Sequence, residues 1–217
     1  GFHFHNHFSR VGLNNIWDGV FFILVIGALW VAWQREKRAG YLLAGLGLGL
    51  AQYFYTTGRT LFLVIAVWLL LAGLFDRPRF RRAIPGLLLM LWVAFIVVLP
   101  LAWFFLQHPA EFMAPLNRVS ILGSWLVQTV SQTGKTPVMI ILEQIWTGML
   151  GYIEIPLRAW YTPGVPLLRT LPGIIFLLGL ALMLLRLKDN RSQLLVIWLF
   201  WFAITGGLSE STPAAQR

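Results

Sequence analysis

Six apolar runs, separated by short charged segments, constrain the fold of this chain more than any other feature. A helix needs about 20 apolar residues to cross the roughly 30 Å hydrocarbon core of a bilayer, and each run reaches or approaches that length. The runs cover residues 16–33, 41–55, 60–75, 84–107, 167–185 and 193–208. This pattern predicts an all-α integral membrane protein with about six transmembrane helices.

The composition excludes the common soluble classes of protein. Apolar residues make up 58% of the chain and charged residues 12%, whereas a soluble domain uses about 25% charged residues to cover its surface. The net charge of +9 is spread between the apolar runs, so nucleic acid is not an expected partner. The absence of cysteine excludes a disulfide framework and a thiolate metal site.

Lysine and arginine residues predict the orientation in the membrane. They gather in alternate short segments between the runs: Arg35, Lys37 and Arg38; Arg77, Arg79, Arg81 and Arg82; Arg186, Lys188 and Arg191. Short loops rich in lysine and arginine stay in the cytoplasm. Residues 1–15, 55–59, 108–166 and 209–217 are therefore expected outside, with both chain ends on the non-cytoplasmic side. The run 41–55 is short and needs flanking residues or local thinning of the bilayer to span it.

The long outer segment 108–166 is too mixed in composition for a pair of ordinary spans. Within residues 137–154, apolar side chains recur on one side of a helix and polar ones on the other. The apolar side has Val138, Ile140, Ile141, Leu142, Ile145, Trp146, Met149 and Leu150, and the polar side has Glu143, Thr147, Gly151 and Glu154. The pattern predicts an amphipathic helix in the membrane interface. A re-entrant or buried helix is the alternative, and residues 124–136 are expected to form a loop.

Chemistry is expected at the outer membrane surface. No predicted span carries a charged residue near its midpoint, where transporters and proton pumps usually need one. The outer face instead holds arginines among acidic residues: Arg10, Asp18, Arg59, Glu111, Arg118, Lys135, Glu143, Glu154, Arg158 and Arg169. Because guanidinium groups match phosphate oxygens in bidentate fashion, these arginines favour a phosphate-bearing lipid as the ligand.

Several segments resemble those of one enzyme family. They are HNHFSRVGLNNIWD at 5–18, YFYTTGR at 53–59, Glu111-Phe112, Asn117-Arg118 and STPAAQR at 211–217. In order and sidedness they resemble bacterial C-type membrane glycosyltransferases of the dolichyl-phosphate-mannose protein mannosyltransferase and aminoarabinose transferase type. The resemblance implies a multi-span enzyme of the inner membrane. It would transfer a sugar from a polyprenyl-phosphate donor to a protein or glycan acceptor at the outer face, with inversion at the anomeric carbon.

The resemblance also implies roles for individual residues. Asp18 matches the family's second acidic position, which orients the acceptor or a cation. Arg59, Arg10 and Arg118 would bind the donor phosphate, and His7, Asn15, Tyr55 and Glu111 would contact substrate. The acidic residue and the arginines also have purely structural explanations. An acidic residue in the first turn of a helix is stabilised by the helix dipole, and an interfacial arginine can lie among lipid headgroups.

The family's principal catalytic acids lie in the first outer loop, after the first span, and the resemblance implies that this chain begins beyond that loop. We therefore expect residues 1–217 to be one transmembrane domain from inside a larger bundle, lacking the general base and inactive alone. No metal or other cofactor is assigned. His3, His5 and His7 alternate as zinc ligands can, but the resemblance makes them interfacial aromatics, and a divalent cation near Asp18 is left open.

Two interpretations from other functional classes are retained. A transporter or flippase-like permease for a lipid-linked or small solute predicts a charged residue within the membrane or a second, related half. A non-catalytic membrane scaffold predicts that replacing Arg59 or Asp18 leaves sugar transfer unchanged.

Overall fold

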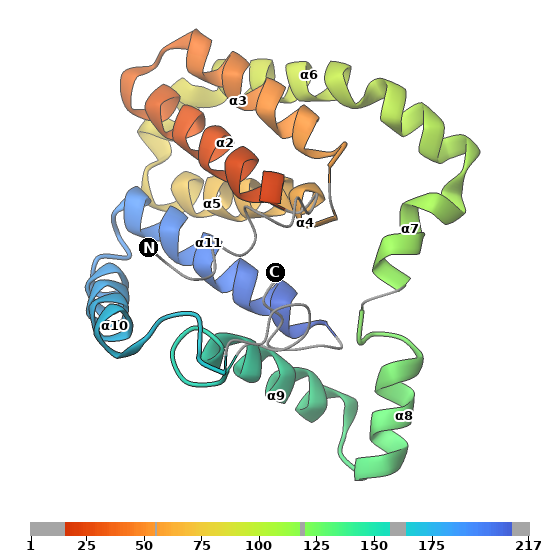
Figure 1. Cartoon of the computed structure of the whole chain (residues 1–217). Coiled ribbons are helices and arrows are strands. Elements are labelled where there is room, and N and C mark those ends of the chain that lie inside the picture. The colour runs from red at the N-terminus through yellow and green to blue at the C-terminus, as the bar shows by residue number, and fades with distance from the viewer. Residues whose placement is uncertain (1–15, 55, 118–119, 157–163, 210–217) are drawn as a thin grey trace. The chain divides into compact units, whose positions relative to one another are not determined.

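The described part of the chain consists of helices joined by turns and short connecting segments. The computed structural model describes residues 16–54, 56–117, 120–156 and 164–209, and these residues contain helices and connecting turns but no strand (Figure 1). The helices are α2 (Ile16–Arg35), α3 (Arg38–Ala51), α4 (Thr56–Arg59), α5 (Leu61–Phe75), α6 (Arg77–Gln107), α7 (Pro109–Asn117), α8 (Ser124–Thr133), α9 (Pro137–Leu150), α10 (Thr170–Leu185) and α11 (Asn190–Gly207). The all-α class predicted from the apolar runs is therefore confirmed.

The predicted loop at residues 124–136 is wrong for residues 124–133, which form the helix α8. The basic segment at residues 77–82, also expected as a loop, forms the first turns of α6. The helix α8 ends where Gly134 adopts a left-handed conformation with φ of 67°, which glycine reaches without steric cost. The Thr136 side chain then accepts a hydrogen bond from the Met139 backbone N–H at the start of α9. The end of α8 and the N-cap of α9 therefore lie close together. The polar residues at this junction make the sequence before it resemble a loop, although it forms a helix.

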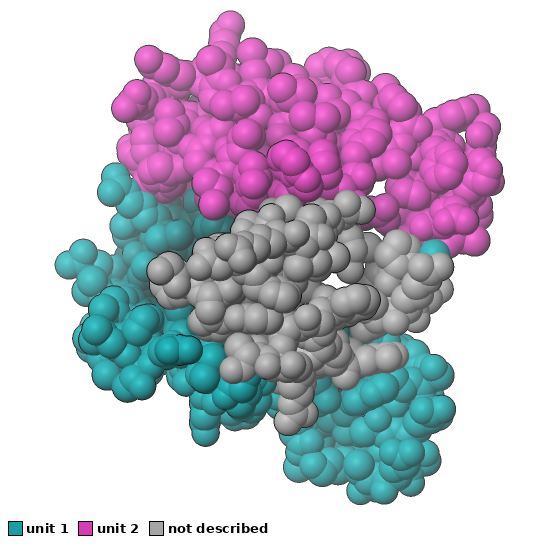
Figure 2. Space-filling view, viewed as in Figure 1, with its two compact units in different colours: residues 1–10, 114–217 teal, residues 11–113 magenta. Residues whose placement is uncertain are grey.

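The described residues separate into two compact units (Figure 2). Unit 2 contains the described residues up to Met113, from α2 to the first half of α7. Unit 1 contains the described residues from Ala114 onward, including α8 to α11. The described residues that were predicted to form the site and those that line the apolar cavity described below belong to different units.

In unit 2, α3 packs between α2 and α6 through glycines that alternate between the two partners. A Cβ atom on Gly47 would lie 2.6 Å from Cδ2 of Leu24 on α2, and one on Gly49 would lie 2.6 Å from Cβ of Val97 on α6. Gly45 faces the Met90 backbone of α6 in the same way. Small residues let helix backbones approach closely, as at interfaces between membrane helices.

The core of unit 2 also contains a pair of buried tryptophans. The rings of Trp33 on α2 and Trp68 on α5 meet edge to face with centroids 5.0 Å apart, and both side chains are almost fully buried. Such an arrangement adds about 0.5–1.5 kcal/mol beyond the burial of apolar area. This contact ties α5 to the layer formed by α2 and α3.

In unit 1, α9 packs closely on α11, and α10 packs beside α11 (Figure 1). A Cβ atom on Gly207 would lie 2.5 Å from Cα of Ile145, and one on Gly148 would lie 2.9 Å from the Ala203 carbonyl oxygen. The two backbones therefore touch at both glycines. Near the same end of α11, the backbone N–H of Ile121 donates to the Leu208 carbonyl over 3.1 Å.

The helix α9 agrees in part with the predicted amphipathic helix, ending at Leu150 instead of residue 154. Val138, Met139, Leu142 and Trp146 are exposed, whereas Gly148 lies against α11. On its polar side, Glu143 accepts from Lys135 Nζ over 2.6 Å. The helix thus has an exposed apolar face besides the face packed in unit 1, and its place in a membrane interface stays a prediction.

Two described helices are long and apolar enough to cross a membrane. They are Trp17–Arg35 and Arg77–Gln107, with mean hydropathy of 1.5 and 2.6 in their most apolar windows. The helices α3, α5, α9 and α10 are apolar but shorter, and α11 begins with the buried polar residues Asn190, Ser192 and Gln193. The two long helices indicate association with a membrane, while a total of about six spans stays a prediction.

Candidate functional site

The structure describes three of the residues predicted to form the site. Asp18 lies in the first turn of α2, Arg59 is the last residue of α4, and Glu111 lies in the first turn of α7. All three belong to unit 2. The other predicted residues, His7, Arg10, Asn15, Tyr55 and Arg118, lie outside the described residues.

The acidic residue Asp18 is buried, with only 5% of its surface exposed. A Cβ atom on Gly58 would lie 3.0 Å from the Asp18 carboxylate oxygen Oδ1 and 2.7 Å from the Ala51 carbonyl oxygen. Only a glycine fits between α2 and the end of α3 at this point. Because the N-terminal end of a helix carries a partial positive charge, the first turn of α2 stabilises the carboxylate.

Aromatic contacts hold the surrounding turn against α2. The rings of Trp17 and Phe21 lie 5.7 and 4.8 Å from the ring of Phe54. On the other side of the same turn, the Tyr53 hydroxyl donates to the Val97 carbonyl of α6 over 2.8 Å. The segment that leads from α3 into α4 is therefore fixed to both α2 and α6.

Arg59 follows Gly58 directly and is held between two phenylalanines. The central carbon of its guanidinium group lies 4.8 Å from the ring centroid of Phe105 on α6 and 5.5 Å from that of Phe112 on α7. These are cation–π distances. The two rings meet edge to face with centroids 5.3 Å apart, so they form one aromatic wall for the cation.

The guanidinium group of Arg59 keeps unused hydrogen-bond donors. Nη1 donates to the Phe112 carbonyl over 3.4 Å, and Nε is buried with no hydrogen-bond partner among the described residues. An arginine has five N–H donors, and a buried donor without a partner costs free energy. Desolvation lowers the pKa of Arg59, although an arginine keeps its charge throughout the accessible pH range. The site is thus ready to accept an anionic ligand.

The fold therefore brings together residues that are far apart in the sequence. Asp18 and Arg59 lie in the same neighbourhood because Gly58 touches the first and precedes the second. Glu111 is exposed, and it is the adjacent residue, Phe112, that contacts Arg59. We call this group the Arg59 site, comprising Asp18, Gly58, Arg59, Phe105 and Phe112.

Three of these residues were not expected from the sequence. Phe105 and Phe112 are two of 16 phenylalanines, and nothing in their local pattern separates a wall for a cation from a lipid-facing ring. Gly58 and Phe112 both lie in segments that resemble the glycosyltransferases, and this position in the chain was the available signal for them. Its role as a spacer beside Asp18 depends on a contact across 40 residues of chain.

The described residues contain no group of three or more histidine, aspartate or glutamate side chains that could hold a metal ion. His3, His5 and His7 lie outside the described residues, and the divalent cation considered near Asp18 stays untested. Among the described residues, the Arg59 site provides guanidinium donors and one buried carboxylate. The guanidinium group suits an anionic ligand. The carboxylate suits a hydroxyl group of that ligand or a cation bound beside it.

Comparison of this chain with protein-family models, with curated proteins and with solved structures finds no match.

Proposed function

We propose that this chain is part of a multi-span membrane glycosyltransferase, which binds a sugar carried on a polyprenyl phosphate and transfers it with inversion at the outer face. The Arg59 site would hold the phosphate of the donor. The observation that carries the proposal is the half-buried guanidinium group of Arg59, whose buried Nε has no hydrogen-bond partner among the described residues. Arg59 directly follows Gly58, which packs against the buried carboxyl group of Asp18.

The exposure of α6 supports the membrane part of this proposal. A hydrophobic helix in the core of a soluble protein is mostly buried, whereas only 17% of the most apolar window of α6 is buried within the structure. Trp92, Phe95, Ile96 and Trp103 are all more than half exposed. An apolar surface of this extent is stable in lipid and prone to association in water.

The chemistry of the Arg59 site supports the phosphate part. Guanidinium groups bind phosphate oxygens through parallel, charge-assisted hydrogen bonds, and the phenylalanine wall orients the group without consuming its N–H donors. The carboxylate of Asp18 would repel a second anion and favours an approach by a hydroxyl or a cation. This is the division of roles that the resemblance implies, with Arg59 on the donor phosphate and Asp18 on the acceptor side.

The permease interpretation predicts a charged group within the membrane, and the described helices favour surface chemistry instead. The charged residues of α2, α3, α6 and α11 all lie within the first or last turns, or in the first two turns of α6, and α5 and α10 contain none. A permease would be favoured if the full chain carried solute across vesicle membranes without transferring sugar.

The donor site can be tested by binding in detergent micelles. We expect the full chain to bind a short polyprenyl phosphate more tightly than the matching polyprenol, and Arg59→Gln to weaken binding of the phosphate by about 10- to 100-fold, the equivalent of one charge-assisted contact. Arg59→Lys should recover little of the loss, because an ammonium group cannot form the bidentate contact. Tryptophan fluorescence titration would measure both affinities.

Arg38→Gln is the matched control for this experiment, because Arg38 is an exposed arginine at the start of α3. Its affinity for the phosphate should equal that of the unmodified chain. Equal affinities for Arg59→Gln and Arg38→Gln, at unchanged helicity, would rule out Arg59 as the donor phosphate ligand.

The orientation can be tested by chemical labelling, which the absence of cysteine makes direct. Single cysteines would replace His108 and Lys135 on the expected outer side, and Lys37 and Lys188 on the expected cytoplasmic side. We expect a membrane-impermeant maleimide to label only the first pair in intact cells and both pairs after permeabilisation. Labelling of Lys37→Cys in intact cells would contradict the orientation. Labelling of all four cysteines in intact cells would contradict a membrane-spanning fold.

A further inference from the structure

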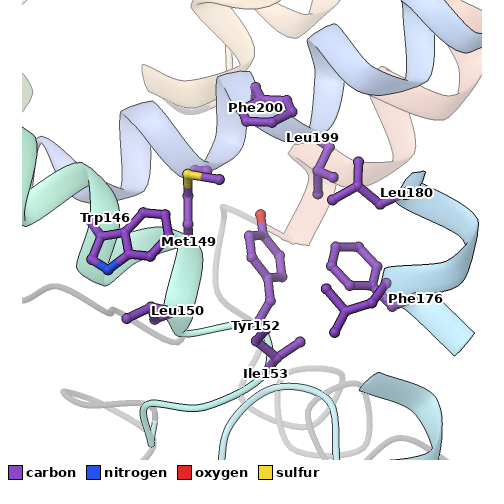
Figure 3. A pocket seen from close by; sticks show the side chains of 11 residues that line it. Trp146, Met149, Leu150, Tyr152, Ile153, Phe176, Leu180, Leu199 and Phe200 are labelled. Atoms are coloured by element: carbon purple, nitrogen blue, oxygen red, sulfur yellow. The ribbon is translucent and has the colours of Figure 1, made fainter. Parts of the chain in front are cut away.

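Unit 1 contains an apolar cavity between the end of α9, the middle of α10 and the second half of α11. Its volume is about 160 Å³. In the described part of the chain eleven side chains line it, and none of these is charged (Figure 3): Trp146, Met149, Leu150, Tyr152, Ile153, Phe176, Leu177, Leu180, Leu199, Phe200 and Ala203. A cavity of about 150 Å³ with such walls stays dry and binds small hydrocarbons, so the lining of this cavity favours an apolar ligand.

A shallower groove of about 620 Å³ adjoins the cavity. Ile153 and Leu177 line both, so the two hollows share a wall. The far side of the groove is formed by Arg169 and Thr170, where α10 begins. The groove thus adds a cation and the N-terminal end of a 16-residue helix to the apolar cavity, and both favour an anion.

Two backbone hydrogen bonds fix the relation between the groove and the cavity. The backbone N–H groups of Leu167 and Leu168 donate to the carbonyl oxygens of Gly151 and Tyr152 over 3.1 and 2.8 Å. They hold the chain that enters α10 against the chain that leaves α9. The position of Arg169 relative to the cavity wall is therefore set by the backbone.

Tyr152 is the side chain in the cavity that carries a hydroxyl group. Its ring stacks on Phe176 with centroids 5.8 Å apart, and its hydroxyl points toward Leu199 and Phe200 (Figure 3). Desolvation raises the pKa of Tyr152 to about 12. The phenol is therefore neutral at physiological pH, and none of the described side chains lining the cavity carries a charge that would oppose a hydrocarbon chain.

We propose that the cavity and the groove together bind one anionic phospholipid, with a segment of its hydrocarbon chain in the cavity and its phosphate at Arg169. The cavity walls are apolar, and among the described residues that line the two hollows Arg169 is the one with a charge. Charge complementarity therefore selects an anionic headgroup over a zwitterionic one. In the proposed topology α10 begins on the outer side, which places Arg169 at headgroup level.

This site lies in unit 1 and does not depend on the Arg59 site in unit 2. It rests on the membrane part of the proposed function, which the labelling experiment tests separately. A failure of lipid binding with correct labelling would therefore concern this site alone.

The experiment measures retention of phosphatidylglycerol and phosphatidylcholine by the full chain in detergent, using native mass spectrometry. We expect phosphatidylglycerol to be retained about tenfold more tightly than phosphatidylcholine, as one charge-assisted contact allows. Arg169→Gln should make the two lipids equal. Arg186→Gln, at the other end of the same helix, is the control and should leave the preference unchanged.

A second pair of variants tests the cavity itself. Leu180→Trp fills the cavity and should lower retention of both lipids, whereas Leu178→Trp changes an exposed residue on the same helix that does not line the cavity and should have no effect. Circular dichroism would verify that helicity is retained. If Leu180→Trp does not fold, the comparison of Arg169→Gln with Arg186→Gln still tests the proposal, because Arg169 is exposed and its replacement should not disturb folding. Equal behaviour within either pair of folded variants would overturn the proposal.

Discussion

Replacing Gly207 by leucine should separate α9 from α11 and destabilise unit 1 by about 3 kcal/mol. A Cβ atom at Gly207 would lie 2.5 Å from Cα and 2.8 Å from N of Ile145, and 2.9 Å from the carbonyl oxygen of Gln144. All three are backbone atoms of α9, which no rotation of a side chain can move aside. The helices must therefore move apart, and the packing between them is lost.

The adjacent residue supplies a matched control. A Cβ atom on Gly206 would have no other atom within 4 Å, so Gly206→Leu should be tolerated although it makes the same chemical change one residue earlier. Hydrogen exchange measured by mass spectrometry would follow each variant in detergent. We expect faster exchange in α9 and α11 for Gly207→Leu only, with α2, α3 and α6 unchanged. Equal exchange in both variants would mean that α9 does not pack on α11 at this point.

Replacing Gly49 by leucine should have the corresponding effect on unit 2. The side chain would collide with Cβ and Cγ1 of Val97, at 2.6 and 2.8 Å from the added Cβ, and with the Ala94 carbonyl oxygen at 3.0 Å. Overpacking of this kind costs about 3 kcal/mol, and leucine's better helix propensity returns about 0.8 kcal/mol. The net destabilisation is expected to be about 2 kcal/mol.

The control for this second prediction is Gly27→Leu on α2. A Cβ atom there would have no other atom within 4 Å, so only the gain in helix propensity remains and the variant should be slightly more stable. Thermal unfolding followed by circular dichroism would measure the difference, and hydrogen exchange in α3 and α6 would assign it to unit 2. A Gly49→Leu variant as stable as Gly27→Leu would contradict the close packing of α3 on α6.

The two glycine experiments also bear on the proposed sites. The Arg59 site depends on α3 and α6, because Tyr53 and Phe105 connect the α4 region to them. Loss of α3 packing should therefore weaken binding of polyprenyl phosphate as well. The lipid cavity of unit 1 has walls on α9 and α11, so Gly207→Leu should reduce lipid retention while Gly49→Leu leaves it unchanged.

The sequence predicted most of the longer helices of this chain. Apolar runs bounded by charges fall on α2, α3, α5, α6, α10 and α11, because helix formation in such runs follows from local composition and length. The helix α6 nevertheless begins at Arg77, inside the basic segment expected to be a loop, and the short helices α4 and α7 were not predicted. The helix α8 was missed, because its polar face resembles a loop and its signals are a glycine stop and a threonine cap that close a helix of only ten residues. Both signals are local and belong to the known rules for helix ends, so α8 could have been predicted from the sequence.

The candidate site was predicted only in part. Charge sidedness and family resemblance named Asp18 and Arg59 as residues of one face, since both depend on order along the chain. The spacing by Gly58 and the wall of Phe105 and Phe112 depend on which helices meet. Such contacts cannot be predicted from one sequence, because an apolar ring on a membrane helix has the same local pattern whether it faces lipid, a neighbouring helix or a cation.

The sequence by itself thus determined that this chain is helical, apolar and asymmetric in charge, because these properties depend on short stretches of residues and their composition. Only the tertiary structure decided that Gly47 faces α2 while Gly49 faces α6, that Arg59 lies against two phenylalanines, and that a cavity opens between α9, α10 and α11. The physical reason is that packing between helices depends on pairs of surfaces, and the two surfaces of a pair come from residues that are far apart in the chain.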